Sequence, residues 1–175
     1  MKVKETIYGE IVGWTGENGS SIMSPHSIDK ISDKKLRKNL KKVNPDGMMY
    51  YSYGCNRGET KFFVYRITQT EEEGKIRELK GSEYYERAKE LELEICPVFE
   101  VFSYQGKEDL IARIENYFKD VIDPTDSRHI KEGVVIRVDA QSERTFALKD
   151  KTKLFKYLEG ISKEDPTMID MEESS

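Results

Sequence analysis

Few residues of the kinds that bind transition metals or form disulfides occur among the 175 residues, which include only two cysteines and two histidines. Cys55 and Cys96 lie far apart and form no C-x-x-C pair, so the sequence predicts neither a zinc site nor a disulfide framework. No apolar run approaches the roughly 20 residues that a membrane helix needs, and the first residues lack the apolar core of a signal peptide. We therefore expect a cytoplasmic protein with no membrane partner.

Charge is plentiful, because 35% of the residues are Asp, Glu, Lys or Arg, and the net charge is −4. The hydrophobic share of 37% includes 18 aromatic residues, which is too many for an intrinsically disordered chain. The negative charge is concentrated at the end, since residues 159–175 hold six acids and one lysine. Residues 27–42 and 128–156 are net basic, at +5 and +4. These two stretches can bind a polyanion, although the overall charge gives no long-range attraction.

Hydrophobic periodicity predicts an α+β fold built on antiparallel sheets, because strands dominate the first half and no βαβ rhythm occurs. A hairpin is predicted between residues 48–53 and 61–68, with a turn over 54–58. The other expected strands are 6–13, 98–102, 132–138 and 145–148. The expected helices are 33–43, 81–94 with Ser82 as N-cap, and 107–121. We expect one domain over residues 1–160 and a flexible acidic tail over 161–175.

The segment with the clearest chemistry pairs an acidic strand start with two nearby lysines. In an extended strand, Lys149 and Lys151 project from the same face, where an anion such as a triphosphate suits them. Glu132 heads an apolar strand, and its carboxylate could hold a divalent cation that bridges the same phosphates. Taken alone, this pattern also fits a solvated edge strand with a charged start.

Four short motifs follow one another along the chain: Tyr8-Gly9-Glu10-Ile11-Val12-Gly13, Phe62-Phe63-Val64-Tyr65-Arg66-Ile67, Glu132-Gly133-Val134-Val135-Ile136-Arg137 and Leu148-Lys149-Asp150-Lys151. Their order resembles motifs III, IIIa, IV and V of the covalent nucleotidyltransferases, and most closely the ATP-dependent RNA ligase family. The resemblance spans residues 7–160. It implies a nucleotidyltransferase (ATP-grasp-like) adenylation domain that uses ATP and Mg²⁺ and acts on RNA. Arg66 departs from the family pattern, which usually shows an acidic residue there.

Carried over by position, the resemblance implies that Glu10 contacts the ribose and Phe62 stacks on the adenine. By alternation, Phe63 and Tyr65 share the opposite face from Phe62, so one face packs in the core and the other meets the base. Glu132 is expected to bind the metal. Lys149 and Lys151 are expected to grip the nucleotide phosphates and to stabilise charge in the transition state.

The positive side chains outside these motifs are candidate contacts for phosphate or RNA. Lys131 and Arg137 flank the proposed metal carboxylate, and Lys38 and Lys41 lie on the basic helix predicted over 33–43. Each of them is equally consistent with a solvated, purely structural role. A contact between this helix and an RNA backbone is expected to weaken with salt.

One family motif is absent from the printed sequence. Members of the family attack ATP with a lysine in Lys-x-Asp/Asn-Gly, which precedes the Tyr-Gly-Glu motif, and no such motif occurs here. We therefore expect an N-terminally incomplete ligase domain, truncated or split, that is inactive alone and needs a second chain or segment to supply the lysine. A second hypothesis is a non-catalytic ATP- and RNA-binding regulator or decoy. A third is an inactive remnant that self-associates through an exposed sheet edge.

Overall fold

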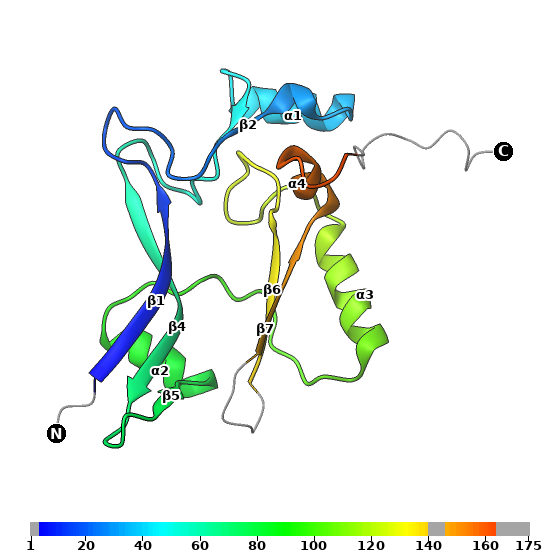
Figure 1. Ribbon diagram of the computed structural model, residues 1–175. Coiled ribbons are helices and arrows are strands. Elements are labelled where there is room, and N and C mark those ends of the chain that lie inside the picture. The colour runs from blue at the N-terminus through cyan, green and yellow to red at the C-terminus, as the bar shows by residue number, and fades with distance from the viewer. Residues whose placement is uncertain (1–3, 140–145, 164–175) are drawn as a thin grey trace.

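The computed structural model describes residues 4–139 and 146–163, and its strands form three antiparallel sheets (Figure 1). The largest sheet has the order β1-β4-β5, with β1 at Lys4–Gly13, β4 at Thr60–Thr70 and β5 at Ile76–Glu78. A separate hairpin pairs β6 (Gly133–Val138) with β7 (Phe146–Lys151). The shortest sheet pairs β2 (His26–Ser27) with β3 (Met48–Met49). The predicted α+β antiparallel fold is confirmed.

The helices surround these sheets, with a 3₁₀ turn at Ile28–Lys30 preceding the first of them. They are α1 (Lys34–Val43), α2 (Gly81–Glu90), α3 (Lys107–Phe118) and α4 (Lys153–Leu158). Figure 1 places the β6–β7 hairpin between the larger sheet and α3, with α1 and α4 at one end of the molecule. Within the part of the chain that the structure describes, no helix combines the length and apolarity needed to cross a membrane.

The hairpin predicted between residues 48–53 and 61–68 is wrong. Met49 pairs with His26 in β2, whereas β4 pairs with β1 and β5. The chain leaves the strand after Met49 and enters the hydrophobic core, where Tyr51 is completely buried. Tyr53 then adopts a left-handed backbone (φ +49°), which ends any extended run before β4 begins.

Two further expectations about local structure are corrected. Helix α2 begins at Gly81 after a cap position at Lys80, so the predicted Ser82 cap is wrong. The helix also ends early, because Glu92 is left-handed (φ +55°) and the Leu93 amide closes the end on the Ala88 carbonyl. The strand predicted over 98–102 is absent, and that segment is an exposed loop in which Val101 is 83% accessible.

Most of the remaining predicted helices and strands are confirmed, and one helix was not predicted. Helices α1 and α3 are confirmed, and the Asp33 side chain caps α1 by accepting hydrogen bonds from two backbone amides. Strands β1, β6 and β7 are confirmed, although Thr145 lies outside the described residues. Helix α4 was not predicted, and it begins where the Thr152 side chain accepts a hydrogen bond from the Phe155 amide. The predicted acidic tail, 161–175, lies outside the described residues except for its first three.

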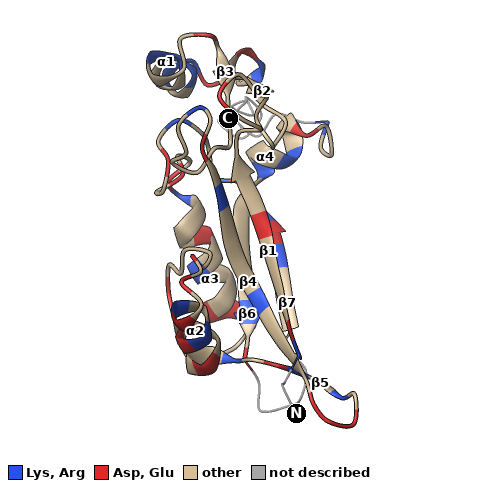
Figure 2. Ribbon diagram, turned by 90° about the vertical axis from the view of Figure 1, so that its left-hand side faces the viewer, with Lys and Arg blue, Asp and Glu red and all other residues tan. Residues whose placement is uncertain are grey.

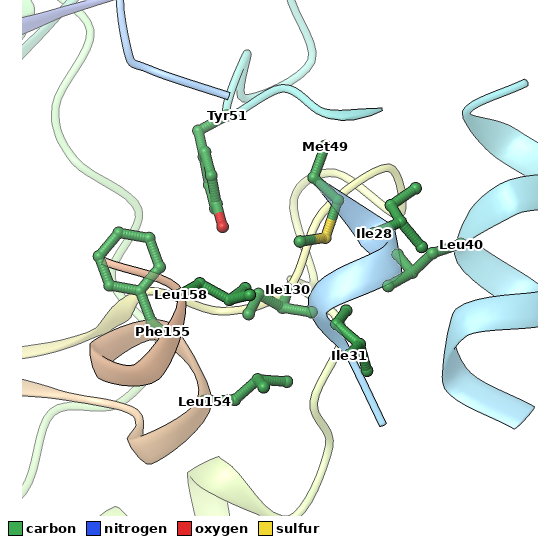
Figure 3. Close-up of a cluster of buried hydrophobic side chains, with 9 residues drawn as sticks. All are labelled: Ile28, Ile31, Leu40, Met49, Tyr51, Ile130, Leu154, Phe155 and Leu158. Atoms are coloured by element: carbon green, nitrogen blue, oxygen red, sulfur yellow. The ribbon is translucent and has the colours of Figure 1, made fainter. Parts of the chain in front are cut away.

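The buried side chains form three clusters that hold these elements together. The largest joins α1, β3 and α4 and is drawn in Figure 3: Ile28, Ile31, Leu40, Met49, Tyr51, Ile130, Leu154, Phe155 and Leu158. A second packs β4 against α2: Val64, Ile67, Leu79, Tyr84 and Ala88. The smallest lies at the end of β1: Val12, Trp14 and Cys55. Burial of these apolar surfaces is the main favourable term in folding.

Candidate functional site

The Glu132 carboxylate lies directly before β6 and is largely removed from solvent. The Tyr53 hydroxyl donates a hydrogen bond to its Oε1 atom. Burial raises the pKa of Glu132, while the Tyr53 hydrogen bond and the positive charge of Lys149 oppose that shift. The negative charge of Glu10 also raises this pKa. Glu132 is therefore a carboxylate whose charge is only partly compensated by the protein, and a bound cation would stabilise it.

The position of Tyr53 is fixed by a clamp centred on Asp126, which is buried. The Asp126 carboxylate accepts hydrogen bonds from the Ser52 hydroxyl (3.2 Å) and the Gly54 amide (2.9 Å), the two neighbours of Tyr53. It also accepts two hydrogen bonds from the Arg128 guanidinium, each 2.8 Å. Burial alone would raise the pKa of Asp126, but these hydrogen bonds outweigh burial and lower it to about 2. The turn at Tyr53 is thus held by a carboxylate that accepts hydrogen bonds on both oxygens.

Glu10 and Phe62, which the sequence predicted to meet the same nucleotide, lie on opposite faces of the larger sheet. The β1–β4 register pairs Glu10 with Phe63 and Ile11 with Phe62, so Phe63 shares the face of Glu10. The Phe62 ring covers Gly9, where an added Cβ atom would lie 2.3 Å from its Cζ atom. The glycine of the Tyr-Gly-Glu motif therefore makes room for Phe62 on the face away from Glu10.

A second aromatic side chain of β4, at a bulge in the strand, accompanies Glu10. The ladder pairs Tyr8 with Arg66 but Gly9 with Val64, which leaves Tyr65 as the extra residue. Val64 and Ile67 are both fully buried in the same cluster, although they lie three residues apart. The two residues between them therefore point to the other side of the sheet. Tyr65 is half exposed there, on the side of Glu10.

The register of β7 places Lys149 and Lys151 on one face of the hairpin, opposite Val135 and Gly133. Lys149 is exposed, and its charge lowers the pKa of Glu132. Lys151 turns to the end of α4, where its Nζ atom lies 2.6 and 2.8 Å from the two carboxylate oxygens of Glu159. The structure thus brings Lys149 and Glu10 into electrostatic range of Glu132, while Lys151 is engaged by another acid.

Lys131 and Arg137, the two positive side chains near Glu132 in the sequence, donate hydrogen bonds to backbone carbonyls of the protein. The Lys131 ammonium donates to the Tyr117 carbonyl and lies 4.1 Å from the centre of the Tyr117 ring. The Arg137 guanidinium donates to the carbonyls of Tyr65 (3.2 Å) and Leu79 (2.7 Å), so it ties β6 to the larger sheet. Both residues thus help to place Glu132 by joining its strand to the neighbouring elements.

Lys38 and Lys41 lie on the basic surface of α1, at the end of the molecule shown uppermost in Figure 2. Lys38 is exposed. The Lys41 ammonium pairs with Asp29 at 2.5 Å, and because both side chains are largely exposed, this ion pair adds little stability.

Tyr53, Asp126 and Glu159 were missed by the sequence analysis. Tyr53 stands directly before a glycine at a turn, and Asp126 precedes Arg128 by two residues, but neither pattern is specific enough to predict a site. Their roles depend on contacts between residues far apart in the chain. The Tyr53–Glu132 pair is separated by 79 residues and the Gly54–Asp126 pair by 72.

The donor set at Glu132 fits a magnesium ion that is held mainly by nucleotide phosphates. Such an ion takes one or two carboxylates and completes its shell with phosphate oxygens and water. Glu132 supplies one partly buried carboxylate with a raised pKa, and Lys149 stands near enough to affect it. Across residues 4–139 and 146–163, no group of three or more acidic, histidine or cysteine side chains forms a complete metal cage. The arrangement therefore suits a metal that arrives with its nucleotide.

Three antiparallel sheets with helices around them, and an acid with a nearby lysine on the β6–β7 hairpin, are consistent with an α+β domain of the nucleotidyltransferase type. The family model described as RNA ligase matches residues 2–158, so the chain belongs to the RNA ligase family. No curated protein and no solved structure matches the chain.

Proposed function

We propose that this chain binds ATP and an RNA end for RNA ligation, with Glu132 as the protein ligand of Mg²⁺ and Lys149 and Lys151 on the phosphates. The observation that carries the proposal is the Glu132 carboxylate, which is partly buried, is held by Tyr53 and has a charge only partly compensated by Lys149. In the complete reaction, AMP passes from ATP to a lysine with release of pyrophosphate, and then to an RNA 5′-phosphate. A 3′-hydroxyl next attacks that phosphate, and AMP leaves.

Within this reaction the chain's own residues bind and orient the phosphates. The bound metal supplies positive charge to the phosphate oxygens. The Tyr53 hydroxyl keeps the Glu132 carboxylate in one orientation, and the Asp126 clamp keeps Tyr53 in place. The Lys149 and Lys151 ammonium groups stabilise the negative charge that develops on the phosphate as it is transferred. Glu10 is proposed to hold the ribose hydroxyls from the facing sheet.

The side chain that stacks on the adenine is proposed to be Tyr65 and not Phe62. Support comes from the alternation along β4, by which Tyr65 faces the side of Glu10, and from the exposure of half of its surface. Fluorescence titration with ATP and magnesium tests this assignment. Tyr65→Ala is expected to weaken binding about tenfold, because stacking on an aromatic ring contributes about 1–3 kcal/mol per base. Phe62→Ala is expected to leave ATP affinity nearly unchanged, and the opposite ranking of the two variants would refute the assignment.

The phosphate grip is tested by the double substitution Lys149→Ala with Lys151→Ala. Magnesium-dependent ATP binding, measured by calorimetry, is expected to fall at least tenfold, because two charges that contact phosphate are lost. The control is Lys89→Ala with Lys107→Ala, which removes the same charge from exposed positions on α2 and at the start of α3. Equal binding by the wild type and the Lys149/Lys151 variant would show that these lysines are not the site.

The lysine that carries AMP is proposed to come from outside the printed residues, because no Lys-x-Asp/Asn-Gly occurs among them. Incubation of the chain with labelled ATP and magnesium is therefore expected to give no acid-stable protein–AMP adduct. An adduct would overturn this part of the proposal and would indicate that a lysine of this chain carries AMP. The ATP-binding measurement above is independent of that result.

A non-catalytic ATP- and RNA-binding protein is the second candidate, favoured by the same missing motif and by the engagement of Lys151 with Glu159. The two functions separate on an RNA donor that already carries AMP on its 5′-phosphate, since joining then needs no adenylated lysine. A catalytic domain is expected to join this donor to a 3′-hydroxyl acceptor with magnesium and to release AMP. Binding of the donor without joining would favour the regulator.

A further inference from the structure

Helix α1 presents a strongly basic face to solvent. At 3.6 residues per turn, its five lysines fall within about a third of the helix circumference: Lys34, Lys35, Lys38, Lys41 and Lys42. All five are exposed. Leu36 and Leu40 lie on the opposite side of the helix, where Leu40 is buried in the largest core cluster. The helix is thus fixed by its apolar side, and its lysines point outward.

The positive charge of this face is compensated only in small part within the described residues. Lys41 pairs with Asp29 at 2.5 Å. Across residues 4–139 and 146–163, no ion pair to an acid is formed by the other four lysines of the face: Lys34, Lys35, Lys38 and Lys42. Three of these follow one another at a spacing of four residues, at which like charges on a helix repel. An anionic partner would therefore stabilise this face.

The chain carries an acidic segment directly after the described residues. Residues 164–175 contain no lysine or arginine and five acids: Glu164, Asp165, Asp170, Glu172 and Glu173. The segment begins near α1, because the amides of Ile161 and Ser162 donate to the Lys156 carbonyl (2.9 and 3.1 Å) and fix the chain to the end of α4. Leu158 of α4 and Leu40 of α1 belong to one core cluster (Figure 3), and both helices lie at the same end of the molecule (Figure 1).

The acidic segment is long enough to reach the basic face. Its twelve residues span up to about 40 Å when extended. Helix α1 has ten residues, so it is about 15 Å long and about 10 to 12 Å across. A segment on so short a tether has an effective concentration of about 1 mM at this surface. An attraction that is weak between separate molecules therefore suffices to hold it there.

We propose that the basic face of α1 is a docking surface for the chain's own acidic segment, residues 164–175, which occupies it in competition with an RNA backbone. The observation behind it is the juxtaposition of exposed lysines that lack acidic partners with a run of acids attached beside them. Uncovered, these lysines would attract the phosphates of any RNA, whatever its sequence. The docked acids thus lower the affinity for RNA in general. The competition with RNA rests on the proposed RNA ligase function, whereas the docking does not.

The docking is tested by treating the full chain with a carbodiimide, which joins a carboxylate to a neighbouring ammonium group without a spacer. Mass spectrometry is expected to find amide bonds between the acids of 164–175 and the lysines of α1. A mixture of isotope-labelled and unlabelled chains shows whether the joined residues belong to one chain. Three results would each overturn the inference: links to the exposed Lys149 or Lys153 in place of α1, links between two chains, or no links from the segment.

The competition is tested by a neutral-segment variant, in which the five acids become amides: Glu164→Gln, Asp165→Asn, Asp170→Asn, Glu172→Gln and Glu173→Gln. We expect it to bind a short fluorescent single-stranded RNA at least fivefold more tightly than the wild type at about 50 mM salt, measured by anisotropy. The gain should shrink as added salt screens the charges. The matched control makes the same change in net charge at exposed acids elsewhere and is expected to bind RNA nearly as the wild type does: Glu72→Gln, Glu73→Gln, Glu86→Gln, Glu108→Gln and Glu115→Gln.

The gain in RNA affinity must also depend on α1. Lys34→Ala, Lys38→Ala and Lys42→Ala together remove three charges from exposed positions, and alanine preserves the helix. With these substitutions in place, neutralising the acidic segment is expected to leave RNA affinity unchanged. An equal gain with and without the three lysines, or no gain when α1 is intact, would overturn the competition. Failure of the wild type to bind ATP would instead contradict the proposed function.

Discussion

Asp126 and Glu132 are two acidic side chains six residues apart, and their surroundings shift their pKa values in opposite directions. Asp126 is buried with hydrogen bonds from Ser52, Gly54 and Arg128, and its pKa falls to about 2. Among the described residues, only Tyr53 donates a hydrogen bond to the Glu132 carboxylate, and burial raises its pKa. The first carboxylate stabilises the native structure, whereas the second is ionised at a cost to stability. A partly buried acid whose charge is not fully compensated is a good candidate for binding a cation.

The largest expected effect on stability comes from Asp126→Ala. This variant leaves the Arg128 guanidinium and the Gly54 amide without their acceptor, and we expect it to lower the free energy of unfolding by about 3 kcal/mol. Urea denaturation at pH 7 measures the loss. Asp120→Ala is the control, because Asp120 is an exposed acid near by in sequence. Equal unfolding midpoints for the two variants would show that Asp126 is not a structural clamp.

Gly133→Ala is expected to act on Glu132 through the backbone. A Cβ atom at this position would lie 2.2 Å from the Asp150 carbonyl oxygen and 2.8 Å from the Lys151 Cα atom, so β6 and β7 must move apart. We expect a loss of about 2 kcal/mol in stability together with weaker ATP binding, measured by denaturation and calorimetry. Val135→Ala, a half-exposed neighbour in β6, should change both quantities far less. A Gly133→Ala variant as stable as the wild type would contradict the close strand approach.

Tyr53→Phe tests the surroundings of Glu132 directly, because it removes the hydrogen bond from Tyr53 to the carboxylate. The expected loss in stability is about 1 kcal/mol, the usual net contribution of such a bond. Mn²⁺ binding in the presence of ATP, followed by electron paramagnetic resonance, should weaken as well, because the carboxylate is no longer held in one orientation. Tyr104→Phe, at an exposed loop position, is the control. Unchanged Mn²⁺ affinity would exclude an orienting role for Tyr53.

The smallest expected effect is a difference in pH dependence with opposite signs for the two acids. The raised pKa of Glu132 means that its contribution favours folding below pH 4.5 and is lost as the pH rises through the folded-state value. Glu132→Gln should therefore be more stable than the wild type at pH 7 and equally stable near pH 4. The lowered pKa of Asp126 contributes stability above pH 3.8 that is lost as the pH falls toward about 2. Thermal unfolding between pH 2 and 7 measures both trends, and a less stable Glu132→Gln at pH 7 would contradict the first.

The sequence predicts the local elements well and the contacts between distant elements poorly. Helix α3 and the strands β1 and β6 follow from the spacing of apolar residues alone. The failed hairpin of residues 48–53 has ordinary β-forming residues, but Tyr51 finds its neighbours in α4 and near His129, which no local pattern reveals. Tertiary packing overrides β propensity there.

In the candidate site, too, the sequence reveals some residues and leaves their distant partners hidden. Glu132, Lys149 and Lys151 stand out in the sequence because charged residues precede or follow an apolar strand. The partners that set their charge and orientation, Tyr53 and Glu159, come from a turn and a helix end with no distinctive pattern. The faces of Phe62, Phe63 and Tyr65 do follow from alternation, as predicted, because the bulge shifts the pattern only from Arg66 onward.

The hydrogen bond between Tyr53 and Glu132 also ties the site to the folding of the whole chain. It joins residues 79 positions apart, so a long loop must close before the carboxylate is in place. Contacts of such long range form slowly, after the local helices and hairpins. The capacity to bind metal and nucleotide should therefore appear with the last step of refolding, and the recovery of ligand binding after dilution from urea can serve as a clock for completion of the native state.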